Sequence, residues 1–186
     1  MRIETIRERI QEYRPERRQD DDLIRAAVLI PLVLSSEGLD LLFTVRTEDV
    51  EHHKGQVSFP GGARESGDAG PESTALREAE EELFLPATDV EVLGRIDDLW
   101  TPTGFIVTPI VGYIADLPPL DPEPREVSDY FLAPLSFFLD DRNGYTKMYH
   151  RDNSREKVWF YEYGEYTVWG VTAFILRNFK KIIIER

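Results

Sequence analysis

The chain has 186 residues, of which 41% are hydrophobic and 11% aromatic, and it carries a formal net charge of −13. This length favours a single globular domain. The absence of cysteine excludes a disulfide framework and a thiolate metal site. The negative charge argues against nucleic acids and anionic membranes as partners, because both require a basic surface. A small anionic substrate stays compatible with it, because a bound metal ion can reverse the local field of a site.

The N-terminal segment predicts a short amphipathic helix over residues 3–13, because isoleucine recurs there at helical spacing. Charged residues alternate with these isoleucines, so the segment lacks the apolar core of a secretory signal. Together with the missing cysteines, this favours a cytoplasmic location. We expect residues 1–22 to form the helix and a charged connector, and residues 23–186 to form one domain. The longest apolar run, residues 26–34, is too short to span a membrane.

Predicted strands and helices alternate along the rest of the chain. Strands are predicted at residues 23–34, 41–47, 56–59, 90–98, 106–114, 145–150 and 158–163. Helices are predicted at residues 71–84 and 169–181. Four prolines within residues 116–125 predict an irregular segment. Strands interleaved with helices indicate an α/β (α+β) fold, in which a mixed β-sheet is sandwiched between α-helices.

The predicted helix over residues 71–84 contains four glutamates within five residues, at 78 and 80–82. Glu78, Glu81 and Glu82 share one face of the helix, where like charges repel one another. A bound divalent cation would turn that repulsion into attraction, and hard cations such as Mg²⁺ prefer carboxylate oxygens. A solvated acidic face is the alternative, and charge runs usually have that meaning. Glu80 lies about 200° away from Glu78 around the helix and is not a candidate ligand.

The residues around these glutamates carry a family resemblance. Arg77–Leu85, with the sequence REAEEELFL, resembles the end of the Nudix box, REUxEExGU, in which U is aliphatic. The start of the box, a glycine followed by a loop and an acidic residue, matches Gly62 and Asp68, although the loop is one residue longer and Phe84 replaces a glycine. Arg77 is expected to brace the loop through ion pairs. The resemblance implies a Nudix fold and hydrolysis of a nucleoside diphosphate linked to another group, with Mg²⁺ or Mn²⁺ as cofactor.

A second resemblance concerns the substrate. LLFTVR at residues 41–46, with Gly55 and FPGG at residues 59–62, resembles the signature of the coenzyme A pyrophosphatase branch of the family. It implies cleavage of coenzyme A or an acyl-CoA to 4′-phosphopantetheine, or its acyl form, and adenosine 3′,5′-bisphosphate. Glu51 replaces an arginine of that signature, so another Nudix substrate such as ADP-ribose or a dinucleoside polyphosphate is one alternative. A non-catalytic Nudix-fold binding module is the other.

The family resemblance also implies roles for individual residues. Glu78 and Glu82 are the implied metal ligands, and Glu81 is a ligand or a neighbour of one. The backbone carbonyl of Gly61 is a further implied ligand. The general base is either Glu82 itself or Glu126, which follows the proline-rich segment. An exposed loop acid is the alternative interpretation of Glu126.

Four residues are candidate contacts to the small nucleoside diphosphate substrate: Arg46, Lys54, Arg64 and Phe105. Arginine and lysine side chains suit phosphate oxygens, and a phenylalanine ring can stack on adenine. A surface ion pair for Arg46, a solvated side chain for Arg64 and core packing for Phe105 are the alternatives. The aromatic run at residues 159–163 is interpreted as sheet packing or as the lining of a subunit interface, which leaves a homodimer open.

Overall fold

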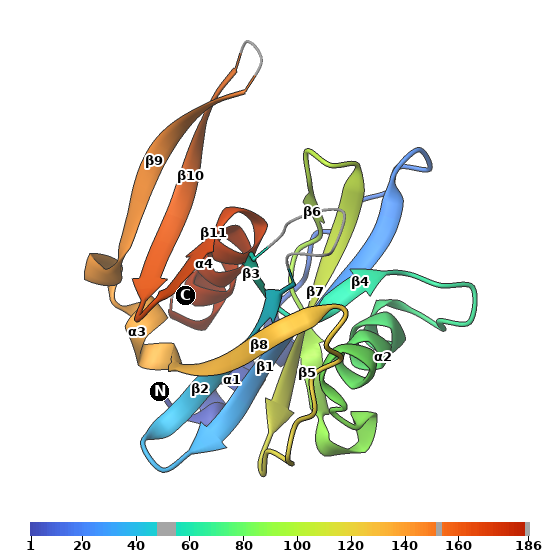
Figure 1. Ribbon diagram of the computed structural model, residues 1–186, viewed down its shortest axis with the longest axis vertical. Coiled ribbons are helices and arrows are strands. Elements are labelled where there is room, and N and C mark those ends of the chain that lie inside the picture. The colour runs from blue at the N-terminus through green and yellow to red at the C-terminus, as the bar shows by residue number, and fades with distance from the viewer. Residues whose placement is uncertain (48–54, 152–153, 185–186) are drawn as a thin grey trace.

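A mixed β-sheet with helices on both faces forms the body of the protein (Figure 1). The computed structural model describes residues 1–47, 55–151 and 154–184. Its helices are α1 (Ile3–Glu12), α2 (Pro71–Leu83), α3 (Leu135–Leu139) and α4 (Gly170–Ile184), with 3₁₀ turns η1 (Ala87–Asp89) and η2 (Asp141–Asn143). Its strands are β1 (Ile24–Ser35), β2 (Gly38–Arg46), β3 (Val57–Ser58), β4 (Gly61–Ala63), β5 (Glu91–Arg95), β6 (Leu99–Trp100), β7 (Phe105–Ile114), β8 (Val127–Pro134), β9 (Gly144–Arg151), β10 (Ser154–Tyr163) and β11 (Tyr166–Trp169).

Strand β1 lies at the centre of the main sheet, whose order is β3-β2-β1-β7-β5. β1 and β7 run parallel, from Ile24 opposite Phe105 to Val33 opposite Ile114, and the other described pairings in this sheet are antiparallel. β4, β6 and β8 pair with β1, β7 and β2, respectively. β1 and β7 are almost continuously buried, because helices cover both of their faces. The expected α+β class, with a mixed sheet between helices, is confirmed.

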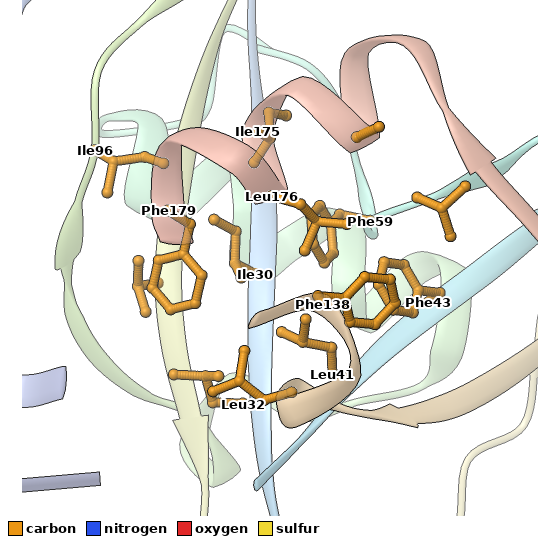
Figure 2. Packing of buried hydrophobic residues seen from close by; sticks show 14 of the residues in the cluster. Ile30, Leu32, Leu41, Phe43, Phe59, Ile96, Phe138, Ile175, Leu176 and Phe179 are labelled. Atoms are coloured by element: carbon orange, nitrogen blue, oxygen red, sulfur yellow. The ribbon is translucent and has the colours of Figure 1, made fainter. Parts of the chain in front are cut away.

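Two hydrophobic clusters, one on each face of the sheet, hold the helices in place. On one face, Ala79 and Leu83 of α2 belong to a cluster that includes Leu29 of β1. On the other face, residues of α4 such as Phe179 belong to a larger cluster that includes Ile30 of β1, and Figure 2 shows these side chains pointing toward each other. Successive residues of a strand point to opposite faces, so neighbouring β1 residues enter different clusters. The sheet therefore separates α2 from α1, α3 and α4.

The N-terminal helix packs into the larger cluster. Ile6 and Ile10 are buried there, and α1 contacts β5 and α4. The predicted boundary after residue 22 stays a prediction. In the described ranges, no helix is long and apolar enough to cross a membrane.

The strands β9, β10 and β11 form a second, antiparallel sheet, and the β9–β10 hairpin projects away from the body (Figure 1). The late hairpin predicted from the sequence is confirmed. Tyr161 and Val168 of this sheet enter the larger cluster. On the other face, the ring of Phe160 lies 5.5 Å from that of Tyr145 and 5.9 Å from that of Trp169, measured between centroids. The aromatic run thus packs within the sheet, and a homodimer stays a prediction.

The prediction from sequence missed four strands and one helix: β4, β6, β8, β11 and α3. β4 consists of two glycines and an alanine, which rarely favour strands, and it forms because it pairs with β1. β8 follows the proline-rich segment directly and is defined by its pairing with β2. The predicted strand over 90–98 is shorter than expected, because β5 ends at Arg95 after an irregularity beside Gly94, where φ is +150°.

Helix α2 ends in the conformation that the family motif suggests. Phe84, which occupies the position of the motif's glycine, adopts the left-handed region with φ 54° and ψ 34°. Its N–H donates to the carbonyl of Glu80 at 2.9 Å, which closes the last turn. Glycine favours this conformation because it lacks a Cβ. The substitution therefore leaves the helix end unchanged and adds local strain.

Candidate active site

The two glycines of β4 bring the backbone close to α2. Gly62 lies opposite Ala27 and Gly61 opposite Val28 in the pairing with β1. A Cβ at Gly61 would lie 2.5 Å from the carbonyl oxygen of Ala27, and a Cβ at Gly62 would overlap the carboxylate of Glu78. Only glycine fits such close approaches. Gly61 therefore lets β4 approach β1 closely, and Gly62 sets the backbone of β4 directly against Glu78 of α2.

Arg77 fixes the loop between β4 and α2. Its Nε and Nη2 donate to the two carboxylate oxygens of Asp68, each at 3.1 Å, and Nη2 also donates to the carbonyl of Ala63 at 3.0 Å. Asp68 accepts two further hydrogen bonds at 2.9 Å, from the hydroxyl of Thr74 and the N–H of Glu65. The Arg77 guanidinium, more than these two bonds, holds the pKa of Asp68 well below its usual range. The expected bracing role of Arg77 is confirmed, and Asp68 is fully engaged in it.

The remaining contacts of Arg77 reach the acidic face of α2. Its Nη1 lies 2.7 Å from Glu81 and 3.0 Å from Glu78. The Glu81 side chain is 58% exposed, whereas that of Glu78 is 13% exposed. Burial raises the pKa of Glu78, and Arg77 opposes that rise. Glu78 therefore lies inside the site and Glu81 at its outer edge.

Glu82 is the most buried of the three glutamates, with 2% of its side chain exposed. Its Oε1 lies 3.7 Å from Nη1 of Arg46, and among the described residues its Oε2 has no hydrogen-bond partner. Burial raises the pKa of Glu82 to about 8. The positive charge of Arg46 opposes this rise, and the negative charges of Glu78 and Glu126 add to it. A hydrogen bond from the backbone of Gly61 lowers the pKa by a smaller amount. Glu82 lies three residues after Ala79 and so shares its side of α2, and Ala79 and Leu83 both pack in the core, which directs Glu82 inward.

The proline-rich segment carries Glu126 to these acids. The N–H of Glu123 donates to the carbonyl of Glu82 at 3.0 Å, and that of Asp121 donates to the carbonyl of Leu83 at 3.1 Å. At its other end, the carbonyl of Glu126 accepts from the N–H of Thr47 at 3.0 Å. The segment thus ties the end of α2 to the end of β2. The side chain of Glu126 is exposed, yet its charge acts on both buried glutamates.

The other predicted substrate contacts are distributed differently. Arg46 is brought to Glu82, as described above. Arg64 is exposed on the loop and donates to the carbonyl of Asp68 at 3.0 Å. Phe105 is partly buried against the larger cluster, on the face of the sheet opposite α2, so it is not brought together with the acids. Lys54 lies outside the described residues, as does Glu51.

The acidic site fits a divalent cation, although Arg46 and Arg77 partly neutralise it in this structure. Within the described part of the chain, no three acidic or histidine side chains already stand in a metal-binding arrangement. Glu82 nevertheless has a buried oxygen without a described partner, and Glu78 stands against the backbone of Gly62. Mg²⁺ and Mn²⁺ prefer carboxylate oxygens as ligands. In this site the carboxylates outnumber the two arginines that pair with them. The donor set is therefore suited to such an ion.

A sandwiched mixed sheet, with a braced glycine-led strand against an acidic helix, is the arrangement that the Nudix-box resemblance implies. Residues 23–152 match the family model described as NUDIX domain. The chain is 38% identical over 164 residues to an uncharacterized Nudix hydrolase NudL of Photorhabdus laumondii, covering 88% of this chain and 87% of that protein. It is 40% identical over 154 residues to NudL of Yersinia pestis, covering 83% and 77%. The chain therefore belongs to the Nudix hydrolase family.

A solved structure agrees with the fold. The M. smegmatis Nudix hydrolase RenU matches with a TM-score of 0.53 and 24% identity, over 61% of this chain and 71% of that one. The family implied by the motif at residues 77–85 is confirmed by the match over residues 23–152, and this structure agrees with the implied fold.

We predict that replacing Glu82 by glutamine changes how stability depends on pH when metal is absent. A carboxyl group with a folded pKa of about 8 contributes stability that is fully present below its unfolded pKa, near 4.3, and is lost as the pH rises through 8. Urea unfolding in EDTA from pH 5 to 9 should therefore show Glu82→Gln gaining on the wild type with rising pH, on the order of 3 kcal/mol across the range.

The exposed Glu80→Gln variant is the control and should differ from the wild type by a constant amount over the same range. A Glu82→Gln difference that is equally flat would show that this carboxylate is not titrating in a buried environment.

Proposed function

We propose that this chain catalyses the divalent-metal-dependent hydrolysis of a nucleoside diphosphate linkage, with coenzyme A or an acyl-CoA as the favoured substrate. The observation that carries the proposal is the buried carboxylate of Glu82, flanked by Glu78 and faced by Arg46. A buried negative charge with a free oxygen is costly unless a cation uses it. The same group of residues offers a guanidinium for a phosphate. Together they suit a bound metal and an anionic substrate.

Glu78 and Glu82 would hold the Mg²⁺ or Mn²⁺ ion, with the carbonyl of Gly61 as a further ligand. Glu81 is exposed and paired with Arg77, which suits support of Arg77 better than direct ligation. When bound, such an ion neutralises phosphate oxygens and makes a water molecule more acidic. The hydrogen bonds of Arg77 to Asp68 keep the glycine strand in place against the acids. This rigidity supports a fixed geometry for the reacting groups.

The remaining chemistry would be carried by side chains at the mouth of the site. Arg46 would bind a phosphate oxygen of the substrate, since its guanidinium is 27% exposed and beside Glu82. Glu126 would accept the proton of the attacking water. Its exposed side chain near both glutamates supports this role over that of Glu82, which is enclosed and is needed as a ligand. Arg64 and Lys54 are proposed as outer phosphate contacts. Phe105 is not proposed as a contact for the base, because it packs on the face of the sheet opposite α2.

The choice of coenzyme A rests on the segments LLFTVR and FPGG. Arg46, the last residue of the first segment, ends β2 beside Glu82, and the glycines of the second form the start of β4. Both segments thus bear on the acidic site, which supports a common role. A different Nudix substrate, such as ADP-ribose or a dinucleoside polyphosphate, is the second candidate. It is favoured by Glu51, whose charge opposes that of the arginine in the coenzyme A signature.

We predict that the purified protein with Mg²⁺ converts coenzyme A to 4′-phosphopantetheine and adenosine 3′,5′-bisphosphate, and that EDTA stops the reaction. Chromatography of parallel reactions with coenzyme A, ADP-ribose and a dinucleoside polyphosphate measures this directly. Turnover of one of the latter two, without coenzyme A cleavage, would contradict the substrate assignment. Inactivity on all three would favour a binding module instead.

We predict that Glu82→Gln and Glu126→Gln slow turnover to different extents. Loss of a metal ligand should cost several orders of magnitude, whereas loss of a general base typically costs about 10²–10⁴-fold. Steady-state rates should be measured with circular dichroism as a check on folding, and Glu80→Gln serves as the charge-matched control. A Glu82→Gln enzyme with a near wild-type rate would refute the metal-site assignment. An unaffected Glu126→Gln would remove Glu126 from the mechanism.

A further inference from the structure

The single guanidinium of Arg46 could pair either with Glu82 or with a phosphate of the substrate. It is the last residue of β2, and its side chain is 27% exposed. Its Nη1 lies 3.7 Å from Oε1 of Glu82, and within the described ranges its buried Nε has no hydrogen-bond partner. A separation of 3.7 Å is an ion pair without a good hydrogen bond. The contact with Glu82 is therefore electrostatic and geometrically loose.

The neighbouring arginine behaves in the opposite way. Arg77 makes hydrogen bonds of 2.7–3.1 Å to Asp68, Ala63 and Glu81, and so uses its guanidinium fully. Its role is fixed by the loop that it holds. Arg46 has no comparable set of short contacts to the described residues, apart from its loose pairing with Glu82. Among the described contacts of the two arginines, those of Arg46 are the ones that can be exchanged without breaking a set of short hydrogen bonds.

We propose that Arg46 is an exchangeable counter-ion, which neutralises Glu82 in the metal-free protein and moves to a substrate phosphate when a divalent cation takes over Glu82. This inference rests on the proposed function, because it assumes that Glu82 is a metal ligand. A cation near Glu82 is repelled by Arg46 as long as the guanidinium stays there. A phosphate that draws Arg46 away lowers this repulsion, and the metal in turn frees Arg46 for the phosphate.

Metal and substrate phosphate therefore assist each other's binding through Arg46, in addition to any direct contact between them. Such coupling is reciprocal, because each ligand must change the affinity of the other by the same factor. The metal-free enzyme would hold nucleotides weakly, since its phosphate-binding arginine is occupied by its own carboxylate. Removing the charge of Glu82 should thus strengthen the binding of a phosphate to Arg46. Removing the charge of Arg46 should strengthen the binding of the metal to Glu82.

The first test measures ADP binding in EDTA at pH 8.8 by calorimetry. Glu82→Gln, which releases Arg46, should bind ADP at least fivefold more tightly than the wild type. Glu80→Gln removes the same charge from the opposite side of the helix and should change the affinity less than twofold. The gain should disappear in the double variant Arg46→Met/Glu82→Gln. An equal gain in Glu80→Gln, or a gain that persists in the double variant, would overturn the proposal.

The second test measures Mg²⁺ binding without nucleotide at the same pH. Arg46→Met should bind Mg²⁺ at least fivefold more tightly than the wild type, whereas Arg46→Lys, which keeps the charge, should stay close to it. Arg125→Met loses the same charge from an exposed side chain paired with Glu123 and is the matched control. Mg²⁺ affinity that is unchanged or weaker in folded Arg46→Met would overturn the proposal.

Different results would refute the counter-ion exchange by Arg46 and the proposed metal-dependent hydrolysis. Mg²⁺-dependent hydrolysis by the wild type, combined with ligand affinities that do not respond to Arg46, would refute the counter-ion exchange and leave the proposed function intact. A wild-type protein that binds no Mg²⁺, with or without ADP, and hydrolyses no diphosphate would refute both.

Discussion

The burial of the Glu82 carboxylate is the constraint to which the rest of the site responds. Packing of Ala79 and Leu83 against the sheet fixes the rotation of α2, and this rotation leaves Glu82 enclosed with 2% of its side chain exposed. An enclosed carboxylate is costly unless charge or hydrogen bonds compensate it. The end of β2 supplies Arg46, and the proline-rich segment caps the carbonyl of Glu82 itself. Segments distant in sequence thus meet around one side chain.

The two arginines of the site divide its electrostatics between them. Arg77 joins the loop, through Asp68, to the acidic face through Glu78 and Glu81, by short hydrogen bonds that define the structure. Arg46 balances Glu82 at longer range. A site with carboxylates in excess and one loosely held arginine would suit the divalent ion that we propose. The ion pairs of Arg77 therefore hold the Nudix box in a fixed structure, and the longer Arg46–Glu82 pair lies beside them.

Much of the fold could be predicted from the sequence, because long helices and strands have a recognisable hydrophobic periodicity. Isoleucine spacing predicted α1, the apolar runs predicted β1 and β7, and the prolines predicted the irregular segment before β8. β4 could not be predicted, since two glycines and an alanine carry no strand signal and become a strand only beside β1. The same holds for β8, which depends on its pairing with β2.

The acidic part of the site was accessible to sequence analysis, because helical spacing places Glu78, Glu81 and Glu82 on one face. The different burial of these three was not, because it depends on how α2 is rotated against the sheet. The face of the sheet on which Phe105 lies could not be predicted from the sequence either. Alternation in a strand separates two faces but does not say which one carries α2. Likewise, four prolines predicted an irregular segment, and only its contacts reveal that it joins the end of α2 to the end of β2, where Glu126 lies.

The most direct measurement of whether these carboxylates form a metal site is urea unfolding of the wild type and Glu82→Gln with increasing Mg²⁺. A ligand that binds only the folded protein stabilises it by about 1.4 kcal/mol at tenfold its Kd and about 2.7 kcal/mol at a hundredfold. We expect the wild type to follow this dependence, EDTA to reverse it, and NaCl of equal ionic strength not to reproduce it. Glu82→Gln should lose most of the effect. Equal stabilisation of both proteins, or none of the wild type, would contradict a metal site at Glu82.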